Sequence, residues 1–192
     1  MNQGKLILII GPSGVGKSVI LKELKRRHPE LIFPRSATTR PRREREGNDL
    51  YRFVSDEEFD ALIADGGVLE WAVVHDGARY GTLVDEIIPS IEDGKVVVRE
   101  VDVQGFESIN KHQYFCGDES PYKLESIFIL PENKEQLIKH ITKRAPIDAD
   151  ELERRIASME KELTYAVDCN HQVINKEGKL KETILEVEGI VW

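Results

Sequence analysis

The sequence predicts an α/β fold in which a parallel sheet is flanked by helices. Three observations predict it. An apolar run over residues 5–10 has the pattern of a strand buried on both faces. A glycine-rich stretch and a helical pattern follow that run directly. Farther along the chain, strand and helix patterns alternate, as they do in parallel sheets with helices on both faces.

The remaining elements follow from local signals. Ser55 with Glu58 forms a capping-box pattern, and Gly66 with Gly67 ends the helix that it begins, at about residue 65. We expect further helices over residues 17–27, 84–93, 133–144, 150–165 and 179–189, and strands over 69–74, 95–101 and 172–175. Residues 145–148 contain a proline between two of these helices, which predicts a hinge for a movable flap.

Composition narrows the function classes. A chain of 192 residues suits one domain, with or without inserted lobes. With 40% apolar and 32% charged residues, it is not a disordered chain, and no apolar run approaches the roughly 18 residues that span a bilayer. The balance of 27 Lys and Arg against 35 Asp and Glu gives a net charge of −8, which disfavours a general nucleic-acid binder. An anionic ligand must therefore meet a local, concentrated positive site.

The cysteines and the start of the chain indicate the compartment. Cys116 and Cys169 lack the spacing of metal ligands and are too few for a disulfide framework, so we expect ordinary reduced thiols. The first apolar run is too short for the hydrophobic region of a signal peptide. These features predict a cytoplasmic protein.

The strongest motif lies between the first strand and the first helix. Its pattern is that of a P-loop, in which backbone N–H groups and a helix N-terminus surround nucleotide phosphates. Glycine allows positive φ and close approach of the backbone to a ligand, Lys17 offers a point charge to the β and γ phosphates, and the Ser18 hydroxyl can bind Mg²⁺. A glycine turn without a nucleotide is the alternative. The predicted phosphate-binding residues are Gly11, Pro12, Ser13, Gly14, Val15, Gly16, Lys17 and Ser18.

A pair of carboxylates follows the strand predicted over residues 95–101. Glu100 and Asp102 are two residues apart, so on a strand they would share one face. The carboxyl ends of parallel strands are where open α/β sheets bind ligands, and there the pair could orient Mg²⁺ or its water ligands. A solvated strand end is the alternative. Arg99, in an otherwise apolar buried strand, requires a polar partner.

A second cationic segment runs from Ser36 to Arg43. It contains three arginines next to hydroxyl side chains, a combination suited to bidentate capture of a phosphate. Taken alone, it could also be a basic surface patch.

Together with four further segments, these motifs resemble the guanylate kinase family. The segments are Tyr51–Ser55, Leu69–Ala72, Tyr80–Thr82 and Val101–Gly105. Their order runs from the P-loop to a C-terminal Val-Ile-Asn segment over nearly the whole chain. The resemblance implies a core of residues 1–32, 84–133 and 156–192, a small mixed α/β GMP-binding lobe over 33–83, and a helical lid over 134–155.

The resemblance also implies roles for single residues. The GMP phosphate would be held by Arg40, Arg43, Tyr51 and Tyr80, while Ser36, Glu70 and Thr82 would read the guanine, with Asp102 also on the GMP side. The Glu70 carboxylate can accept from guanine N1–H and the exocyclic amine, donors that adenine does not present in that arrangement. Phosphoryl transfer would depend on Lys17, Arg40, Arg144 and Arg155, and Asn175 matches the segment that meets the adenine of ATP.

The chain departs from the family pattern in four places. His140 stands where the family usually has another lid arginine, which puts full activity in doubt because such an arginine stabilises transition-state charge. Glu100 replaces the usual aspartate and keeps its charge. One residue fewer separates Arg40 from Tyr51, and extra polar chain occurs over residues 111–123.

The function implied is Mg²⁺-dependent transfer of the ATP γ-phosphoryl group to GMP, and to dGMP, giving ADP and GDP. Expected partners are these small molecules, with no nucleic acid and no membrane, and the chain would be a monomer or a homodimer. One alternative is a catalytically weak or silent module that binds a phosphorylated or acidic partner through Arg40, Arg43 and Tyr51. Another is a P-loop kinase for a different small phosphate acceptor.

Overall fold

The fold was analysed in a computed structural model that describes residues 4–74, 77–117, 119–144 and 148–192. The chain divides into two compact units. The first unit contains residues 4–6 with Leu31–Val98 and Gln104–Leu124, and the second contains Ile7–Glu30, Arg99–Val103 and Glu125–Trp192.

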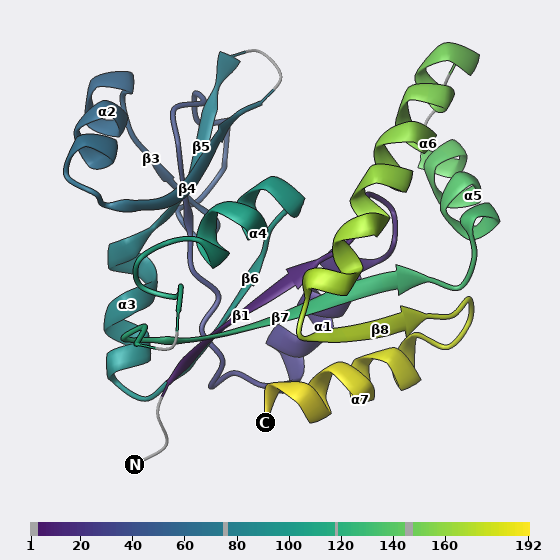
Figure 1. Cartoon of the computed structure of the whole chain (residues 1–192). Coiled ribbons are helices and arrows are strands. Elements are labelled where there is room, and N and C mark those ends of the chain that lie inside the picture. Colours follow the sequence, from purple (N-terminus) through teal and green to yellow (C-terminus); the bar gives the residue numbers. More distant parts are fainter. Residues whose placement is uncertain (1–3, 75–76, 118, 145–147) are drawn as a thin grey trace. The chain divides into compact units, whose positions relative to one another are not determined.

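A four-stranded parallel sheet has the strand order β6-β1-β7-β8 (Figure 1). In its register, Ile127 lies opposite His171 and Ile129 opposite Val173. Every residue from Leu6 to Ile10 is fully buried, as the apolar run predicted. The predicted α/β class is confirmed. The strands are β1 (Lys5–Ile10), β6 (Val96–Glu100), β7 (Lys123–Pro131) and β8 (His171–Asn175).

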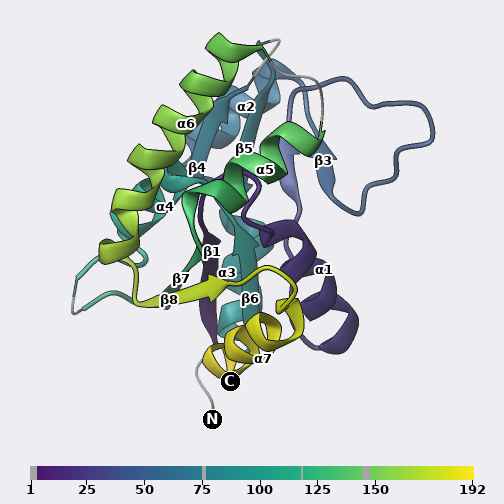
Figure 2. The ribbon, with the colours of Figure 1, turned by 90° about the vertical axis from the view of Figure 1, so that its right-hand side faces the viewer.

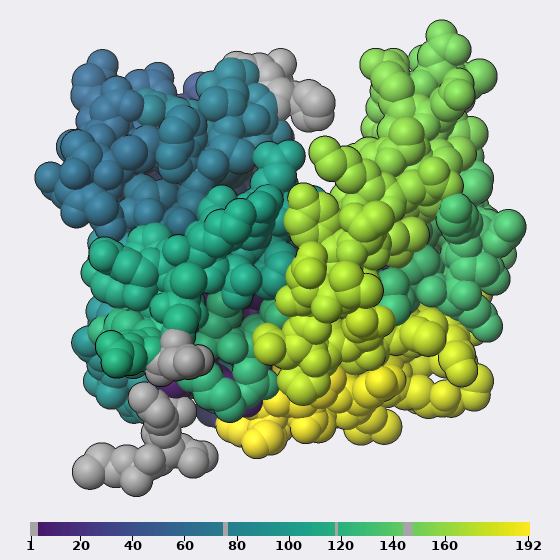
Figure 3. Space-filling model, viewed as in Figure 1, coloured from purple at the N-terminus to yellow at the C-terminus, as the bar shows by residue number. Residues whose placement is uncertain are grey.

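Helices of the second unit accompany these strands. They are α1 (Lys17–Arg27), α5 (Lys134–Arg144), α6 (Ala149–Leu163) and α7 (Leu180–Val191), with a 3-10 helix over Thr164–Asp168. α7 packs against both β8 and α1 (Figure 2). Most side chains of α6 lie at the surface (Figure 3), whereas Met159 is buried. Asp148 begins α6 by accepting a 2.8 Å hydrogen bond from the Glu151 backbone N–H.

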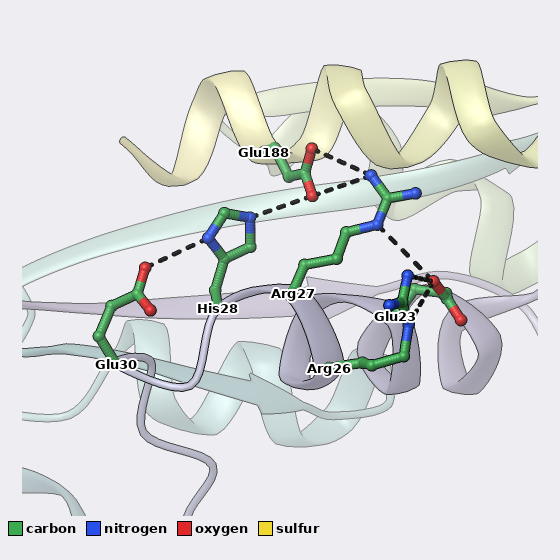
Figure 4. A network of polar contacts seen from close by, with 6 residues as sticks. All are labelled: Glu23, Arg26, Arg27, His28, Glu30 and Glu188. Carbon is green, nitrogen blue, oxygen red and sulfur yellow. Dashed lines mark hydrogen bonds and ion pairs between the residues drawn. The ribbon is translucent and has the colours of Figure 1, made fainter.

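A polar network joins the end of α1 to α7 (Figure 4). Glu188 of α7 accepts from Arg27 Nη1 at 3.2 Å and lies 3.0 Å from His28 Nε2. The other ring nitrogen of His28 lies 3.2 Å from a Glu30 oxygen, so a protonated ring can donate to both carboxylates. Glu188 is only 15% exposed, which makes its hydrogen bonds a substantial part of this helix contact.

The first unit is built on a second sheet, of order β3-β2-β5-β4. Its helix α2 covers one face, where Phe59 is fully buried with Ala37 and Leu83 and its ring contacts Trp71. The elements of this unit are β2 (Ser36–Thr38), β3 (Tyr51–Phe53), β4 (Val68–Val73), β5 (Arg79–Leu83), α2 (Asp56–Ala64), α3 (Val84–Glu92) and most of α4 (Val103–Asn110).

Local signals fixed most element ends but not the partner of every strand. The Ser55 capping box is confirmed, because Ser55 Oγ accepts from the Glu58 N–H at 3.1 Å and Glu58 Oε2 accepts from the Ser55 N–H at 2.7 Å. The alternation of strand and helix patterns alone would put the strand expected over 69–74 in the parallel sheet, but this strand lies in the second sheet. β4 pairs antiparallel with β5, since the short connection between them can only return the chain as a hairpin.

Two further expectations concern the hinge and the absence of a membrane span. Residues 145–147 of the proposed hinge lie outside the described residues. Within the described part of the chain, helices are too short or too polar to cross a bilayer.

The network in Figure 4 predicts a stability loss. Glu188→Ala removes the acceptor shared by Arg27 and His28, so the free energy of unfolding should fall by about 1–3 kcal/mol in chemical denaturation. Glu182→Ala on the same helix is the control, because Glu182 is 65% exposed and should change stability by less than about 0.5 kcal/mol. Equal effects of the two variants would contradict a special role for Glu188.

Candidate functional site

The glycine-rich loop connects β1 to α1 and has the backbone that the P-loop motif predicted. Gly11 has φ 145° and Gly16 φ 105°, both in the region that favours glycine. A Cβ on Gly11 would lie 2.5 Å from the Ile129 carbonyl oxygen, and one on Gly16 would lie 2.6 Å from Asn175 Nδ2. Glycine is therefore required at both positions by conformation and by space.

Lys17 is held against this loop. Its Nζ donates to the carbonyl oxygens of Gly11, at 2.6 Å, and Pro12, at 3.2 Å, and lies 3.8 Å from Glu100 Oε1. The side chain is 12% exposed. Burial lowers the pKa of Lys17, and the negative charge of Glu100 acts in the opposite direction. The ammonium group is thus positioned beside the loop before any ligand arrives.

Oxygen-bearing side chains gather next to Lys17. Ser18 Oγ donates to Glu100 Oε2 at 3.3 Å. Lys17, Ser18, Glu100, Asp102 and Glu162 of α6 line a cavity of about 260 Å³ together with the loop. Hydroxyl and carboxylate oxygens are ligands that suit Mg²⁺. Among the described residues, there is no group of three or more His, Cys, Asp or Glu side chains that could hold a metal. The Ser18 hydroxyl and the carboxylates of Glu100 and Asp102 are therefore groups that can hold Mg²⁺ or its water ligands.

A second cavity, of about 350 Å³, also borders this loop, at Gly14 and Gly16. It is lined by α5 residues His140 and Lys143, by Asn175 at the end of β8, and by the segment that leads into α7. His140 Nδ1 lies 3.0 Å from the Gly14 carbonyl oxygen. α5 and β8 thus both reach the loop within the second unit.

Asn175 is part of a buried chain of hydrogen bonds. Its Nδ2 donates to the Val15 carbonyl at 2.8 Å, and its Oδ1 accepts from Thr183 Oγ1 at 3.1 Å. Its backbone carbonyl accepts from Gln136 Nε2 at 2.9 Å. Since both ends of the amide side chain are used, Asn175 connects α5, α7 and β8 to the loop.

The first unit presents a row of polar side chains across three strands. In the register of the second sheet, Ser36 of β2 lies opposite Thr82 of β5, and Thr82 lies opposite Glu70 of β4. Residues directly opposite each other project from the same face of a sheet. Thr82 Oγ1 donates to Glu70 Oε1. Tyr51 of β3 extends the row, because it lies opposite Ser36. Residues that are 46 positions apart in the chain, Ser36 and Thr82, therefore act at one place.

Arg40 lies among aromatic rings on this unit. Its Nε donates to Tyr80 Oη at 3.1 Å, and its Cζ lies 5.4 Å from the ring centroids of both Tyr51 and Phe53. Both terminal nitrogens donate to Glu46, at 3.0 and 2.7 Å. These hydrogen bonds raise the pKa of Arg40 and lower the pKa of Glu46 to about 2. The guanidinium is fixed in place by a bidentate carboxylate and two ring faces.

Some predicted site residues belong neither to the P-loop region nor to the polar row with Arg40. The Arg43 side chain is exposed, and its backbone N–H donates to Glu46 at 3.0 Å. Arg155 donates to Glu151 of its own helix at 2.8 Å and is not among the described residues that line either cavity. The side chain of Arg144 lies outside the described part of the structure. Asp102 lies in the second unit, with the P-loop.

Sequence reasoning missed several residues that the structure brings to these sites. Glu46 is one, because nothing in the charged run around it distinguishes it from Glu44. Glu162 and Thr183 are others, and they reach the P-loop region only through the tertiary fold. His140 was noted for the charge it lacks, whereas its contact with Gly14 could not be read from the sequence.

Comparisons with known proteins agree on one family. The family model described as guanylate kinase matches residues 3–192. A curated guanylate kinase from Thermosynechococcus vestitus is 38% identical over 191 residues, which covers 98% of this chain and 94% of that protein. One from Campylobacter jejuni is 39% identical over 179 residues, covering 92% and 83%. The crystal structure of a guanylate kinase from Anaplasma phagocytophilum shares the fold, with a TM-score of 0.68, 22% identity, and coverage of 100% of this chain and 86% of that chain.

The pairing of Glu46 with Arg40 predicts a pH dependence. Because the pKa of Glu46 falls from 4.5 to about 2 on folding, its stabilising contribution is complete above 4.5 and is lost as the pH falls through about 2. An NMR titration of the Glu46 carboxyl should therefore show a midpoint near 2, and Arg40→Met should return it toward 4.5. The exposed Glu44 serves as the internal control. A Glu46 midpoint that Arg40→Met does not move would contradict the assignment.

Proposed function

The chain belongs to the guanylate kinase family, and on that premise we propose that it transfers the γ-phosphoryl group of ATP to GMP, giving ADP and GDP. Membership confirms the resemblance of its motifs to this family and makes the chain a nucleoside monophosphate kinase.

One observation in particular supports GMP as the acceptor. A P-loop would serve many phosphotransfer reactions, but the row of Ser36, Thr82 and Glu70 is a second, separate set of polar groups. It lies on the unit that also holds Arg40, Tyr51 and Tyr80, so a base-reading row and a phosphate-binding group occur together. A purine monophosphate has both features that these groups can bind.

Glu70 is the residue that we propose to select guanine. A carboxylate accepts hydrogen bonds and donates none, so it matches the adjacent N1–H and exocyclic amine of guanine. Thr82 uses its hydroxyl hydrogen on Glu70, which holds the carboxylate in position. Adenine would leave the carboxylate partly unpaired, and a site built around buried polar groups rejects such a ligand strongly.

The acceptor phosphate would bind to Arg40, Arg43, Tyr51 and Tyr80, with Asp102 also on the GMP side. Arg40 is the best supported member, since its guanidinium is already oriented by Tyr80 and by two ring faces. We propose that the phosphate replaces Glu46 as the bidentate partner of Arg40.

On the donor side, the residues of the P-loop from Gly11 to Ser18 would bind the ATP phosphates, and Asn175 would lie at the adenine end. Ser18 would hold Mg²⁺, with Glu100 and Asp102 in contact with its water ligands. When bound, Mg²⁺ supplies positive charge to the phosphate oxygens.

Transfer itself needs no general base. An oxygen of the GMP phosphate, already ionised at neutral pH, forms the new bond to the γ-phosphorus, while the bond from that phosphorus to the β,γ-bridging oxygen breaks and the electron pair leaves with ADP. Lys17, Arg40, Arg144 and Arg155 are the proposed catalytic cations. They would align the two polyanions and reduce their repulsion.

Further parts of the proposal rest on the family resemblance. We propose residues 33–83 as the GMP-binding lobe, 134–155 as the lid, and 1–32, 84–133 and 156–192 as the core. We also propose dGMP as a second acceptor, a cytoplasmic location, and a monomer or homodimer.

Lys17→Ala tests the donor site. With Mg²⁺, ATP and GMP, the wild-type chain should form ADP in a GMP-dependent manner, and the variant should lose at least about 100-fold in kcat because the β and γ phosphates lose their cation. GMP binding, measured by calorimetry, should stay within about threefold since Arg40 and the row of Ser36, Thr82 and Glu70 belong to the first unit and Lys17 to the second. Wild-type protein that binds a phosphopeptide but shows no GMP-dependent turnover would instead support a silent binding module.

Glu70→Gln tests the acceptor site. The amide offers a donor where guanine also donates, so the ratio of kcat/KM for GMP to that for AMP should fall about 10- to 100-fold, while KM for ATP stays within about threefold. A panel of GMP, dGMP, AMP, CMP and UMP in one coupled assay measures this. Glu57→Gln, at an exposed position of α2, is the matched control. Equal losses for GMP and ATP would place the base site elsewhere.

A further inference from the structure

Side chains from three elements hold carbonyl groups of the P-loop. Lys17 binds the carbonyls of Gly11 and Pro12, and Asn175 binds that of Val15. His140 of α5 contacts a further loop carbonyl, that of Gly14, at 3.0 Å. In a trans peptide the C=O and the following N–H point to opposite sides. Each held carbonyl except that of Gly11, which precedes a proline, therefore fixes the direction of an N–H group that a P-loop uses for phosphate.

The peptide between Gly14 and Val15 shows this effect. His140 fixes the Gly14 carbonyl, and the Val15 N–H points across the loop, where it makes a 3.3 Å bond to the Pro12 carbonyl. That bond is long for an N–H donor, so a phosphate oxygen can compete for the N–H. Gly14 has φ 86°, in the left-handed region that favours glycine, and the His140 contact holds its carbonyl in this conformation.

The Gly14 carbonyl determines which imidazole nitrogen of His140 carries the hydrogen. A carbonyl oxygen can only accept, so His140 Nδ1 must carry the hydrogen. The neutral Nδ1–H tautomer meets this requirement, and so does the protonated ring. The contact therefore needs a correctly placed N–H and does not need a positive charge.

We propose that His140 is a positioning residue that orients the P-loop for ATP by donating from Nδ1 to the Gly14 carbonyl. This inference rests on the proposed function, because it assumes that the loop binds ATP phosphates. It assigns His140 a role different from that of a cationic lid residue. The imidazole acts on the loop, and the loop acts on the nucleotide.

Amide substitutions test which nitrogen is used. In His140→Asn the side-chain NH₂ occupies about the place of Nδ1, and in His140→Gln it lies one bond farther out, near the place of Nε2. We expect His140→Ala to weaken ATP binding about 5- to 30-fold, His140→Asn to restore it to within about threefold, and His140→Gln to leave it near the Ala value. Binding is measured by calorimetry without any acceptor.

A pH series and a kinetic comparison complete the test. Lys143, Lys176 and Glu177 line the same cavity, and Lys139 pairs with Glu177, so the same charged side chains surround position 140 in every variant. The ratio of ATP affinity between wild type and His140→Asn should then stay constant from about pH 6 to pH 8. In turnover with saturating GMP, His140→Ala should raise KM for ATP more than it lowers kcat. Thr142→Ala, on the same helix, should leave both values unchanged.

The outcomes separate this inference from the proposed function. The His140 variants could show the expected order of ATP affinities while the wild-type chain shows no GMP-dependent turnover. That result would support the role of His140 and reject GMP phosphorylation. Recovery by His140→Arg with no recovery by His140→Asn would show that charge is what matters and would overturn the inference. If the His140 variants unfold at the wild-type temperature and all bind ATP with equal affinity, the inference is overturned as well. A wild-type chain that binds no ATP would reject both.

Discussion

The orientation of the peptide groups between β1 and α1 is the constraint on which the rest depends. The chain carries a net charge of −8, so a polyanionic nucleotide is not attracted by the protein as a whole. Attraction has to come from local groups, namely the backbone N–H groups of one loop, a helix N-terminus and nearby cations such as Lys17. Lys17, His140 and Asn175 hold the loop carbonyls from three different elements, so the loop has its shape before it meets a ligand.

The second constraint is strand register. Ser36, Thr82 and Glu70 come from three strands, and a slip of one residue in either pairing would turn the affected side chains to the opposite face. The packing of α2 prevents that slip. A Cβ at Gly81, between the polar residues Tyr80 and Thr82, would lie 3.0 Å from Phe59 Cζ, so a larger residue there would press against the helix that covers this face. The apolar face thus fixes the polar one.

The sequence predicted the parts of this structure whose signals are local. β1, α1 and the Ser55 capping box were predicted with their ends, because an apolar run, a glycine turn and a cap lie within a few residues of one another. β2 and β3 span Ser36–Thr38 and Tyr51–Phe53, which is too short for a periodicity to show. β5, the antiparallel partner of β4, was missed as well. β7 was also missed, although Ile127–Ile129 is fully buried and apolar. The motif residues of both sites could be named from the family resemblance, whereas partners such as Glu46 and Thr183 become visible only once tertiary contacts are known.

Carboxylate partners explain how an acidic chain keeps cations in place for anionic ligands. Lys17 lies 3.8 Å from Glu100, Arg40 binds Glu46 through both terminal nitrogens, and Arg155 binds Glu151. A half-buried cation without a partner would be costly, and a flexible one would lose entropy when it bound a ligand. An internal carboxylate avoids both costs, but it also competes with the ligand. A phosphate must therefore offer more than a carboxylate does, through a second charge and through simultaneous contacts from its nucleoside. Small monovalent anions have neither a second charge nor a nucleoside. The internal carboxylates therefore reduce the affinity for every anion, but they favour the nucleotide over small anions.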